Sequence, residues 1–301
     1  MTGAGPGGDS VAAVAITYQR RDMLRVTLQG LLDQERPVDE IIVVDNASVD
    51  GSAAMLDEEF PTVTHLRMER NLGPAGALHV GLGYAHQRGH RWGWTTSDDI
   101  VARPEALRTL LDAAHRIDDH RLGLLGCWFE PVSTHFTFNG ALWRNRMVLQ
   151  DLPPVGSPPY RTDIMVFKGT LISLDMVPEI GLPHDHYFLM NEEYEYCLRA
   201  SRHGRRHYVL PQPLLRPLEE EPPSGYPAWR GYYQARNQLA MILEHRSPGE
   251  LWWWAIAQAK FAVAAVRRRH EVWDDISLRL LGAWHALRGV SGITIDPAKR
   301  A

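Results

Sequence analysis

Acidic residues stand at three places in the sequence where side chains of their type could bind a cation, a nucleotide or a proton. The first is the segment WTTSDDI, in which Asp98 and Asp99 follow an apolar stretch. Mg²⁺ and Mn²⁺ prefer hard oxygen ligands, often one or two carboxylates completed by substrate phosphates. These two aspartates therefore predict a metal and diphosphate site. The alternative is that they cap the helix that follows them.

The second place is Asp45, with Asn46, directly after the apolar run Ile41–Val44. In open α/β sheets, ligands bind outside the carboxyl ends of the strands, so a carboxylate there can contact a base or a ribose. The residue types of VVDNASVDGS are equally typical of an Asx turn and a helix cap. The nearby turn RNLGPAG, which contains Asn71, predicts either close approach of a phosphate to a helix N-terminus or an ordinary glycine turn.

The third place is the segment NEEYEYCLRASR, which opens a predicted helix. Helical spacing puts Glu195 on the same side as Arg199, and Glu192 joins them, so that side is predicted to be charged and solvated. Glu193 instead shares its side with the apolar residues Tyr196, Cys197 and Ala200. A carboxylate on an apolar face can have a raised pKa and act as a general base. Stabilisation by the helix macrodipole is the usual explanation for acids in a first turn.

The elements that must position these residues alternate along the chain. Apolar runs predict strands near residues 11–16, 41–44, 63–68, 92–96, 122–127, 166–174 and 208–210. Helical periodicity predicts helices near residues 23–32, 52–60, 75–87, 104–117 and 192–203. Residues 128–160 are typical of loops that cover a site, and the chain beyond Trp229 is predicted to be helical. The alternation predicts an α/β fold with a mostly parallel central sheet.

The composition of the 301 residues excludes several classes of protein. With 45% hydrophobic and 23% charged residues, the chain should fold around a sizeable core. The net charge of −4 provides no field for polyanions, so nucleic acid is excluded as an expected partner. Cys127 and Cys197 lie far apart and outside any CxxC pattern, which indicates two buried thiols in a reducing, cytoplasmic compartment. The run Leu251–Val266 is too short and too polar to predict a transmembrane helix.

The joint order of several motifs is more specific than any one of them. The segments AITYQRRDMLRVTLQGLL, IIVVDNASVDGS, RNLGPAGA, WTTSDDI, FKGTLIS, GLPHDHYFLMNEEYEYCLRASRHG and YYQARN occur in this order between Val11 and Leu239. In that order they resemble a family 2 glycosyltransferase with a GT-A fold, of the bacterial rhamnosyl- and galactofuranosyltransferase-like kind. The resemblance implies a Rossmann-like nucleotide-binding half fused to an acceptor half.

The resemblance also implies roles for individual residues. The nucleotide of a nucleoside-diphosphate-sugar donor would be held by Thr17, Arg20, Asp45, Asn71 and Asp98. The metal-binding acidic element would fall on Ser97, Asp98 and Asp99, and the general base on Glu193. Transfer to an acceptor hydroxyl with inversion at the anomeric carbon is then expected, in the synthesis of a bacterial glycan or a glycosylated natural product.

Two departures from the family pattern bear on the metal. Ser97 stands where the first carboxylate of the acidic element is usual, and Arg216, in PLLRP, stands where a histidine is often found. We therefore expect weak, donor-dependent binding of Mg²⁺ or Mn²⁺. Arg216 would add positive charge beside the departing diphosphate, the alternative being a solvated surface arginine.

The chain is expected to contain a flexible leader at residues 1–10, a GT-A catalytic domain at 11–228 and a helical extension at 229–301. The extension carries the aromatic residues Trp252, Trp253, Trp254 and Phe261, which are followed by a basic run at Arg267–Arg269. This pattern predicts either peripheral contact with the inner face of the membrane or a packed, homodimer-forming helix. The rival functions are a catalytically degenerate nucleotide-sugar-binding protein and a sugar nucleotidyltransferase. TYQRRD lacks the glycines that the latter needs after the first strand.

Overall fold

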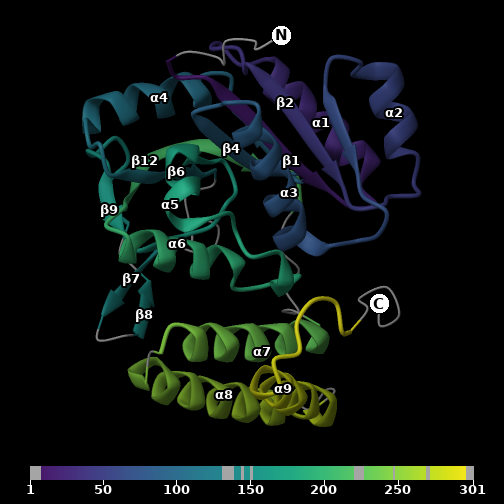
Figure 1. Ribbon diagram of the computed structural model, residues 1–301, viewed down its shortest axis with the longest axis vertical. Coiled ribbons are helices and arrows are strands. Elements are labelled where there is room, and N and C mark those ends of the chain that lie inside the picture. Colours follow the sequence, from purple (N-terminus) through teal and green to yellow (C-terminus); the bar gives the residue numbers. More distant parts are fainter. Residues whose placement is uncertain are drawn as a thin grey trace.

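The structure of the chain is a computed structural model (Figure 1), which describes residues 8–130, 139–143, 146–149, 152–219, 227–246, 248–268 and 272–295. Most of the predicted leader and the arginine at position 269 therefore lie outside the described residues.

The bounds of the elements follow the predicted alternation. The helices are α1 (Arg21–Leu32), α2 (Ser52–Glu59), α3 (Gly73–Gln87), α4 (Ala106–Ile117), η1 (Leu174–Met176), α5 (Val177–Ile180), η2 (Asp185–Tyr187), α6 (Glu192–Arg202), α7 (Ala228–Glu244), α8 (Pro248–Arg268) and α9 (Val272–Leu287). The strands are β1 (Val11–Thr17), β2 (Glu40–Asp45), β3 (Thr64–Arg67), β4 (Trp92–Ser97), β5 (Ile100–Ala102), β6 (Leu122–Phe129), β7 (Asn139–Trp143), β8 (Arg146–Leu149), β9 (Tyr160–Thr162), β10 (Ile164–Met165), β11 (Thr170–Ser173) and β12 (Arg206–Pro217).

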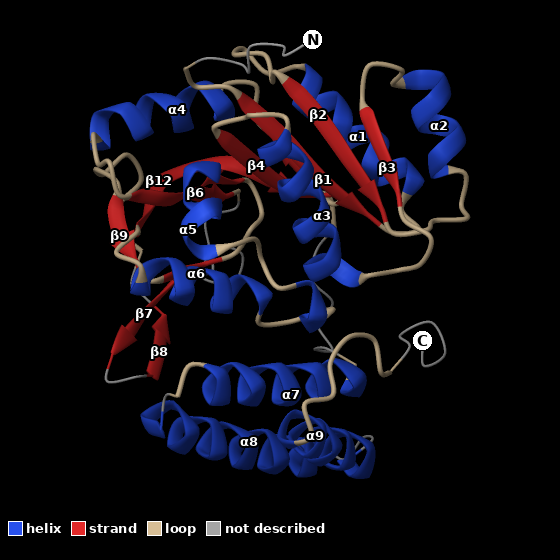
Figure 2. Ribbon diagram, viewed as in Figure 1, coloured by secondary structure: helices blue, strands red, loops and turns tan. Residues whose placement is uncertain are grey.

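The main sheet is mixed and mostly parallel, with helices on both faces (Figure 2). Its order is β3-β2-β1-β4-β11-β6-β12-β5, and β9 pairs with β12. Strands β1 to β4 are parallel to one another, as are β6 and β12, whereas β11, β5 and β9 are antiparallel to their neighbours. The predicted α/β fold with a mostly parallel sheet and a helical C-terminal extension is confirmed.

Two hydrophobic cores lie on opposite faces of this sheet, because side chains along a strand alternate with a period of two. Ala13 and Val43 belong to the core beneath α1, α2 and α4, whereas Val14 and Val44 belong to the core beneath α3 and α6. Helix α3 lies so close to β1 that a Cβ on Gly81 would stand 2.4 Å from Val14 Cγ1. The small residues of α3 thus let it pack directly on β1 and β2.

The part of the chain after α4 contains more strand than the sequence predicts. Strands β7 to β9 occupy part of the stretch predicted as loops, and β12 runs through the prolines to Pro217 instead of ending at Leu210. Its pairing with β6 shifts register on either side of Pro213. Proline has no N–H to donate, so strands accept it at such irregularities.

The helical extension packs below the part of the chain that contains the main sheet, with α7 next to it and α8 and α9 farther out (Figure 1). The motif YYQARN lies in α7. Asn237 Nδ2 donates to the carbonyls of Tyr187, Leu189 and Met190 at 2.7–2.9 Å, and Arg236 Nη2 donates to that of Tyr187 at 3.0 Å. The motif therefore fixes the loop that precedes α6. No helix in the described ranges is long and apolar enough to span a bilayer.

Candidate active site

The predicted nucleotide-binding residues meet where three parallel strands end. Thr17 pairs with Asp45 in the register of β1 and β2, and Ile16 pairs with Ser97 in that of β1 and β4. Because carboxyl ends of parallel strands meet at one edge of a sheet, Asp45 and Asp98 lie on either side of the end of β1.

Asp98 holds the loop after β1 in place. Its Oδ2 accepts hydrogen bonds from Thr17 Oγ1 at 2.9 Å and from the Tyr18 N–H at 3.2 Å, while Oδ1 lies 3.6 Å from an Arg20 nitrogen. Burial raises the pKa of Asp98 to about 6, against the opposing effects of Arg20 and Thr17. The structure thus brings three of the residues predicted to bind the donor, Thr17, Arg20 and Asp98, into direct contact.

Asp99 lies between two cations and keeps one oxygen free. Its Oδ2 stands 3.4 Å from Arg20 Nη1 and 3.5 Å from Lys168 Nζ. Burial alone raises the pKa of Asp99, but Lys168, a hydrogen bond from Ser97 and Arg20 outweigh it and hold the pKa below its ordinary value. Its Oδ1 is buried and has no hydrogen-bond partner among the described residues.

This orphaned oxygen fits a divalent cation, because an ionised carboxylate with an unpaired lone pair is the ligand that Mg²⁺ and Mn²⁺ favour. The flanking arginine and lysine reduce the net negative charge of the site. The arrangement therefore fits a cation that depends on the donor's diphosphate for its remaining ligands.

Asp45 is completely buried, yet only one of its oxygens is satisfied. Oδ1 accepts the Ser48 N–H at 2.8 Å, whereas Oδ2 lies 3.6 Å from His65 Nε2 and makes no hydrogen bond among the described residues. Burial alone would raise the pKa of Asp45, but His65 and Ser48 outweigh it and lower the pKa. An ionised carboxylate with a free oxygen can accept a hydrogen bond from a ribose hydroxyl or a base N–H.

The turn RNLGPAG is held by two asparagines. Asn71 Oδ1 accepts the Gly73 N–H at 2.8 Å, and Asn46 Oδ1 accepts the Leu72 N–H at 3.1 Å. Gly73 has φ +70°, and a Cβ there would stand 2.1 Å from the carbonyl oxygen of Phe188. Only glycine fits this contact, which joins the start of α3 to the loop before α6.

Glu193 lies in the first turn of α6 and is half-buried. Its Oε1 accepts the Phe167 N–H at 2.7 Å. Burial raises the pKa of Glu193, although the Phe167 N–H and the charge of Lys168 oppose the rise. Since residue 167 contacts Glu193 and residue 168 contacts Asp99, one short segment joins the predicted base to the acidic pair.

The other acids of α6 are not on a solvated face, so that sequence-based prediction is wrong. Glu192 is buried with Oε2 unpartnered, and burial together with the charge of Glu193 raises its pKa. Glu195 is fully buried, and its two oxygens accept from Arg199 at 2.8 and 2.9 Å. The loop before α6 and the end of α7 cover this side of the helix.

Glu195 is the centre of an ion-pair cluster that joins α6 to α7. His245 Nε2 lies 3.2 Å from Glu195 Oε1, and His184 Nε2 lies 3.6 Å from it and 3.2 Å from Glu244 Oε1. Single atoms of His184, Glu195 and Glu244 all lie within 4.8 Å of one another, a spacing that a metal could use. The bidentate contact with Arg199 already neutralises Glu195, which favours an ion-pair cluster over a cation site.

Glu195→Gln is expected to lower the free energy of unfolding by about 3 kcal/mol, because it leaves Arg199 without its counter-charge in a buried place. Burial alone would raise the pKa of Glu195, but hydrogen bonds from His245 and Arg199 lower it to about 2. The folded-state pKa lies below the ordinary 4.5, so the stabilisation is present above about pH 4.5 and is lost as the pH falls through about 2.

Thermal unfolding measures this effect, with a fall in Tm of roughly 6–12 °C at neutral pH that shrinks below about pH 4. Glu59→Gln, which removes an exposed partner of Arg25, is the matched control and should leave Tm nearly unchanged. Equal Tm values for the two variants would contradict the role given to Glu195.

Arg216 is exposed and pairs with Val101 in the register of β12 and β5, next to the pair Pro217–Ile100. The neighbouring Leu218 N–H donates to the carbonyl of Asp99 at 2.8 Å. The Arg216 side chain makes no hydrogen bond or ion pair with any other residue in the described ranges. It therefore stands close to the acidic pair along the backbone and is free to contact a ligand.

Two residues of this site were not predicted from the sequence. Lys168 could have been suspected from FKGT, where a cation precedes a glycine and a strand. His65 lies in β3 and carries no motif of its own, so only the pairing of Val43 with His65 places it beside β2 and Asp45.

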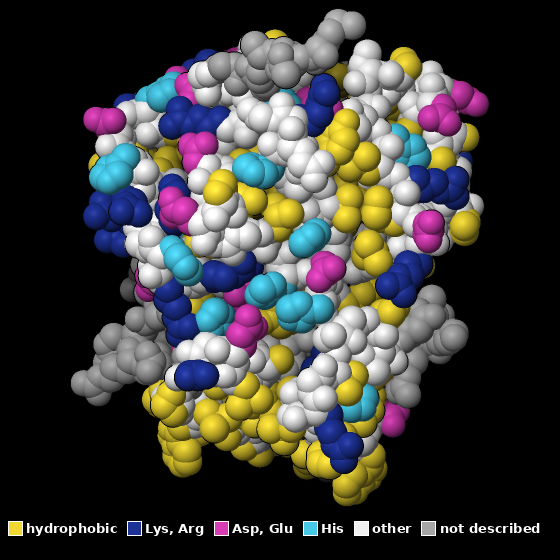
Figure 3. Space-filling view, viewed as in Figure 1, with side chains coloured by type: hydrophobic (Ala, Val, Ile, Leu, Met, Phe, Trp, Pro, Cys, Tyr) yellow, Lys and Arg dark blue, Asp and Glu magenta, His cyan; other side chains and the backbone are white. Residues whose placement is uncertain are grey.

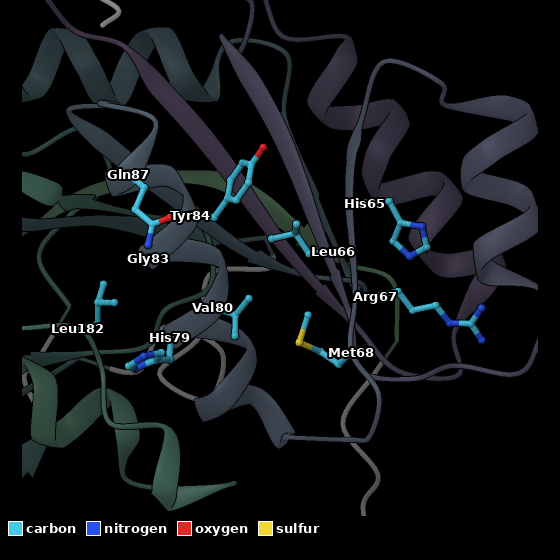
Figure 4. A pocket seen from close by; sticks show the side chains of 10 residues that line it. All are labelled: His65, Leu66, Arg67, Met68, His79, Val80, Gly83, Tyr84, Gln87 and Leu182. Carbon is cyan, nitrogen blue, oxygen red and sulfur yellow. The ribbon is translucent and has the colours of Figure 1, made fainter. Parts of the chain in front are cut away.

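A cavity of about 550 Å³ opens between β3 and α3, away from the acidic pair (Figure 4). It is lined by His65, Leu66, Arg67, Met68, His79, Val80, Gly83, Tyr84, Gln87 and Leu182. None of the residues predicted to carry the reaction lines it. His65 lines the cavity and also contacts Asp45, so it connects the cavity to the residues at the ends of β1, β2 and β4.

The mixed, mostly parallel sheet and the helices that cover both of its faces give the chain a GT-A-type fold. Residues 13–148 match the model of glycosyl transferase family 2, and the chain belongs to this family of glycosyltransferase enzymes. The resemblance inferred from the motifs is confirmed.

Proteins with similar sequences include two that are named as sugar transferases. Galactofuranosyltransferase GlfT1 of Mycolicibacterium smegmatis is 30% identical over 202 residues, which are 64% of this chain and 66% of the relative. The chain thus spans about two thirds of that relative's length. The dTDP-rhamnosyl transferase RfbF of Shigella flexneri is 21% identical over 252 residues, 79% of this chain and 82% of the relative.

Solved structures support the fold. A structure of S. aureus TarS in complex with UDP-GlcNAc matches with a TM-score of 0.57 at 17% identity, covering 93% of this chain and 92% of that one. Mannosyltransferase PcManGT from Pyrobaculum calidifontis, in complex with GDP-Man and Mn²⁺, matches with a TM-score of 0.57 at 15% identity, covering 95% and 91%.

Proposed function

We propose that the chain is an inverting glycosyltransferase that moves a sugar from a nucleoside-diphosphate-sugar donor to an acceptor hydroxyl in bacterial glycan or glycosylated natural-product synthesis. One observation carries the proposal. The segment Phe167–Lys168 ties Glu193, whose pKa is raised by burial, to Asp99, which lies between two cations. A proton acceptor and a site for a leaving diphosphate are thus held by neighbouring residues.

In the proposed reaction, Glu193 takes the proton of the acceptor hydroxyl while that oxygen forms a bond to the anomeric carbon. The bond from the anomeric carbon to the diphosphate oxygen breaks, and the electron pair leaves with the nucleoside diphosphate. Attack from the face opposite the leaving group inverts the configuration. Arg20, Lys168 and Arg216 would stabilise the charge on the departing diphosphate.

Asp98 and Asp99 would hold Mg²⁺ or Mn²⁺, which when bound would neutralise part of the diphosphate charge. The Mn²⁺ complex of the mannosyltransferase supports a cation of this kind. The relatives named for galactofuranosyl and dTDP-rhamnosyl transfer support a hexose or deoxyhexose donor. A cytoplasmic location, with the helical extension contacting the membrane or a second copy, belongs to the same proposal.

Release of nucleoside diphosphate tests this function against its rivals. The purified chain is incubated with UDP-, dTDP- and GDP-sugars, with and without Mn²⁺, and free nucleoside diphosphate is measured. Slow donor hydrolysis, accelerated by an acceptor, is expected. Tight donor binding without any release would favour a degenerate binding protein, and release of pyrophosphate from a nucleoside triphosphate would favour a nucleotidyltransferase.

Asp45→Asn is expected to weaken nucleotide binding by about 10-fold to 100-fold, because a charged acceptor with a free buried oxygen is replaced by a neutral amide. Isothermal titration with the preferred nucleoside diphosphate measures the change. Asp57→Asn, on the exposed side of α2, is the control and should bind normally. If both variants bind like the wild type, VVDNAS is only a helix-capping turn.

A further inference from the structure

The outer surface of the helical extension is apolar to an unusual degree. Trp273 is 81% exposed, Trp252 67% and Leu280 66%. Further side chains on the same two helices are more than half exposed, namely Leu287, Val266, Val263 and Trp284. Exposed hydrophobic residues are ordinary when scattered, but a contiguous group of them marks an interaction site.

Helical spacing gathers these residues into one stripe on each helix. On α8 the exposed positions Trp252, Ala255, Ala259, Val263 and Val266 recur every three or four residues and are all apolar. On α9 the exposed positions Trp273, Ser277, Leu280, Trp284 and Leu287 recur in the same way. We call these two stripes together the outer face.

The outer face is not needed to hold the extension together. The opposite side of α9 packs on α7, where Leu278 is buried beside Tyr232 and a Cβ on Gly282 would stand 2.4 Å from the Tyr232 carbonyl oxygen. Figure 3 shows hydrophobic side chains gathered at the bottom of the molecule, over α8 and α9. The helices therefore use one side for the fold and present the other to a partner.

We propose that the outer face docks on the surface of a membrane that contains anionic lipid. The exposed charges agree with this partner. Lys260 on α8 and Arg288 just after α9 are exposed, and Arg288 stacks on the Trp284 ring at 4.3 Å. On the described parts of α8 and α9 the one exposed acid is Asp274.

A second copy of the chain fits the face less well. A two-fold contact places the same patch on both sides, so Lys260 and Arg288 would approach like charges with few acids to pair with them. Lipid headgroups supply the missing negative charge, and tryptophan rings suit the boundary between headgroups and acyl chains. An apolar face joined to a basic rim supplies the two signals that stable peripheral binding needs. This proposal does not depend on the transferase activity.

Vesicle flotation tests the proposal. The full chain is mixed with vesicles of phosphatidylcholine alone or of phosphatidylcholine with phosphatidylglycerol. The test protein carries Trp252→Gln, Trp273→Gln and Trp284→Gln, and the control carries Val26→Gln and Val155→Gln, two exposed apolar positions outside the extension. Donor hydrolysis in solution and Tm verify that both variants fold.

The wild type and the control should float with the anionic vesicles, and the triple variant should bind them at least about tenfold more weakly. Tryptophan emission of the wild type should shift to the blue on binding, as its rings leave water. Equal flotation of all three proteins, or none by the wild type, would overturn the proposal. A dimer in sedimentation experiments that the triple variant abolishes, without vesicle binding, would overturn it in favour of a second copy.

Discussion

Glu193→Gln should reduce turnover by about 10²-fold to 10⁴-fold while the affinity for the donor stays nearly unchanged. Glutamine keeps the size of the side chain and can still accept the Phe167 N–H, but it cannot take a proton from the acceptor. Donor binding is expected to persist because the residues proposed to hold the nucleotide lie on β1, β2 and β4. Single-turnover transfer and titration with donor measure the two quantities separately.

The pH dependence adds a signature that a purely structural role would not give. Burial raises the pKa of Glu193, so the acid limb of kcat/KM should lie above the ordinary glutamate value of 4.5. Glu192 is buried beside Glu193, and burial together with the charge of Glu193 raises the pKa of Glu192 to about 8. Glu192 is therefore protonated in the range where Glu193 titrates, so Glu192→Gln removes no charge there and should leave the acid limb nearly unchanged, with only a small loss of maximal rate.

Glu192→Gln is therefore the matched control, since it makes the same chemical change one residue away in the same first turn of α6. Losses of equal size in the two variants would remove the case for Glu193 as the base. A large shift of the acid limb in Glu192→Gln would contradict the assignment of a protonated Glu192 beside Glu193.

The sequence was sufficient to place the candidate site residues at the ends of the strands, but not to predict which side chains surround them. Asp45 and Asp98 could be placed at the strand-end edge because each follows an apolar run, and parallel strands bring such ends together. Lys168 escaped prediction because its contact with Asp99 spans residues far apart in the chain. The contact forms because β11 lies antiparallel between β4 and β6 in the sheet. The spacing of apolar residues in the sequence does not predict that strand order.

The error at Glu195 has a different physical origin. Spacing correctly grouped Glu195 with Arg199 on one side of α6, but it could not show that α7 and the loop at His184 would cover that side. A charged stripe is normally solvated, and here its charges pair with one another under other elements. The extension of β12 through its prolines was missed for a similar reason, because β6 supports the strand by pairing that is long-range in sequence.

Asp99→Asn is expected to abolish most of the stimulation of transfer by Mn²⁺, a loss of roughly 10²-fold at saturating metal. Asparagine preserves the shape of the side chain but removes the charge, and the orphaned Oδ1 is the atom on this residue best placed to ligate a cation. The rate with Mn²⁺ divided by the rate in chelator isolates this effect from changes in folding. That ratio should fall to about 1 in the variant, whereas the control Asp22→Asn, at an exposed acid of α1, should keep the wild-type ratio.

The same substitution should affect the metal-free reaction in the opposite direction. Asp99 neutralises Lys168 and part of the Arg20 charge in the wild type, so its neutralisation leaves more positive charge to attract the diphosphate. Residual transfer in chelator should therefore be retained or increased in Asp99→Asn, and Lys168→Met in the same background should reduce it. A variant that keeps its Mn²⁺ stimulation would show that the cation binds elsewhere. Loss of the chelator-resistant rate in Asp99→Asn would show that the arginine and lysine serve to position Asp99 and do not act on the donor.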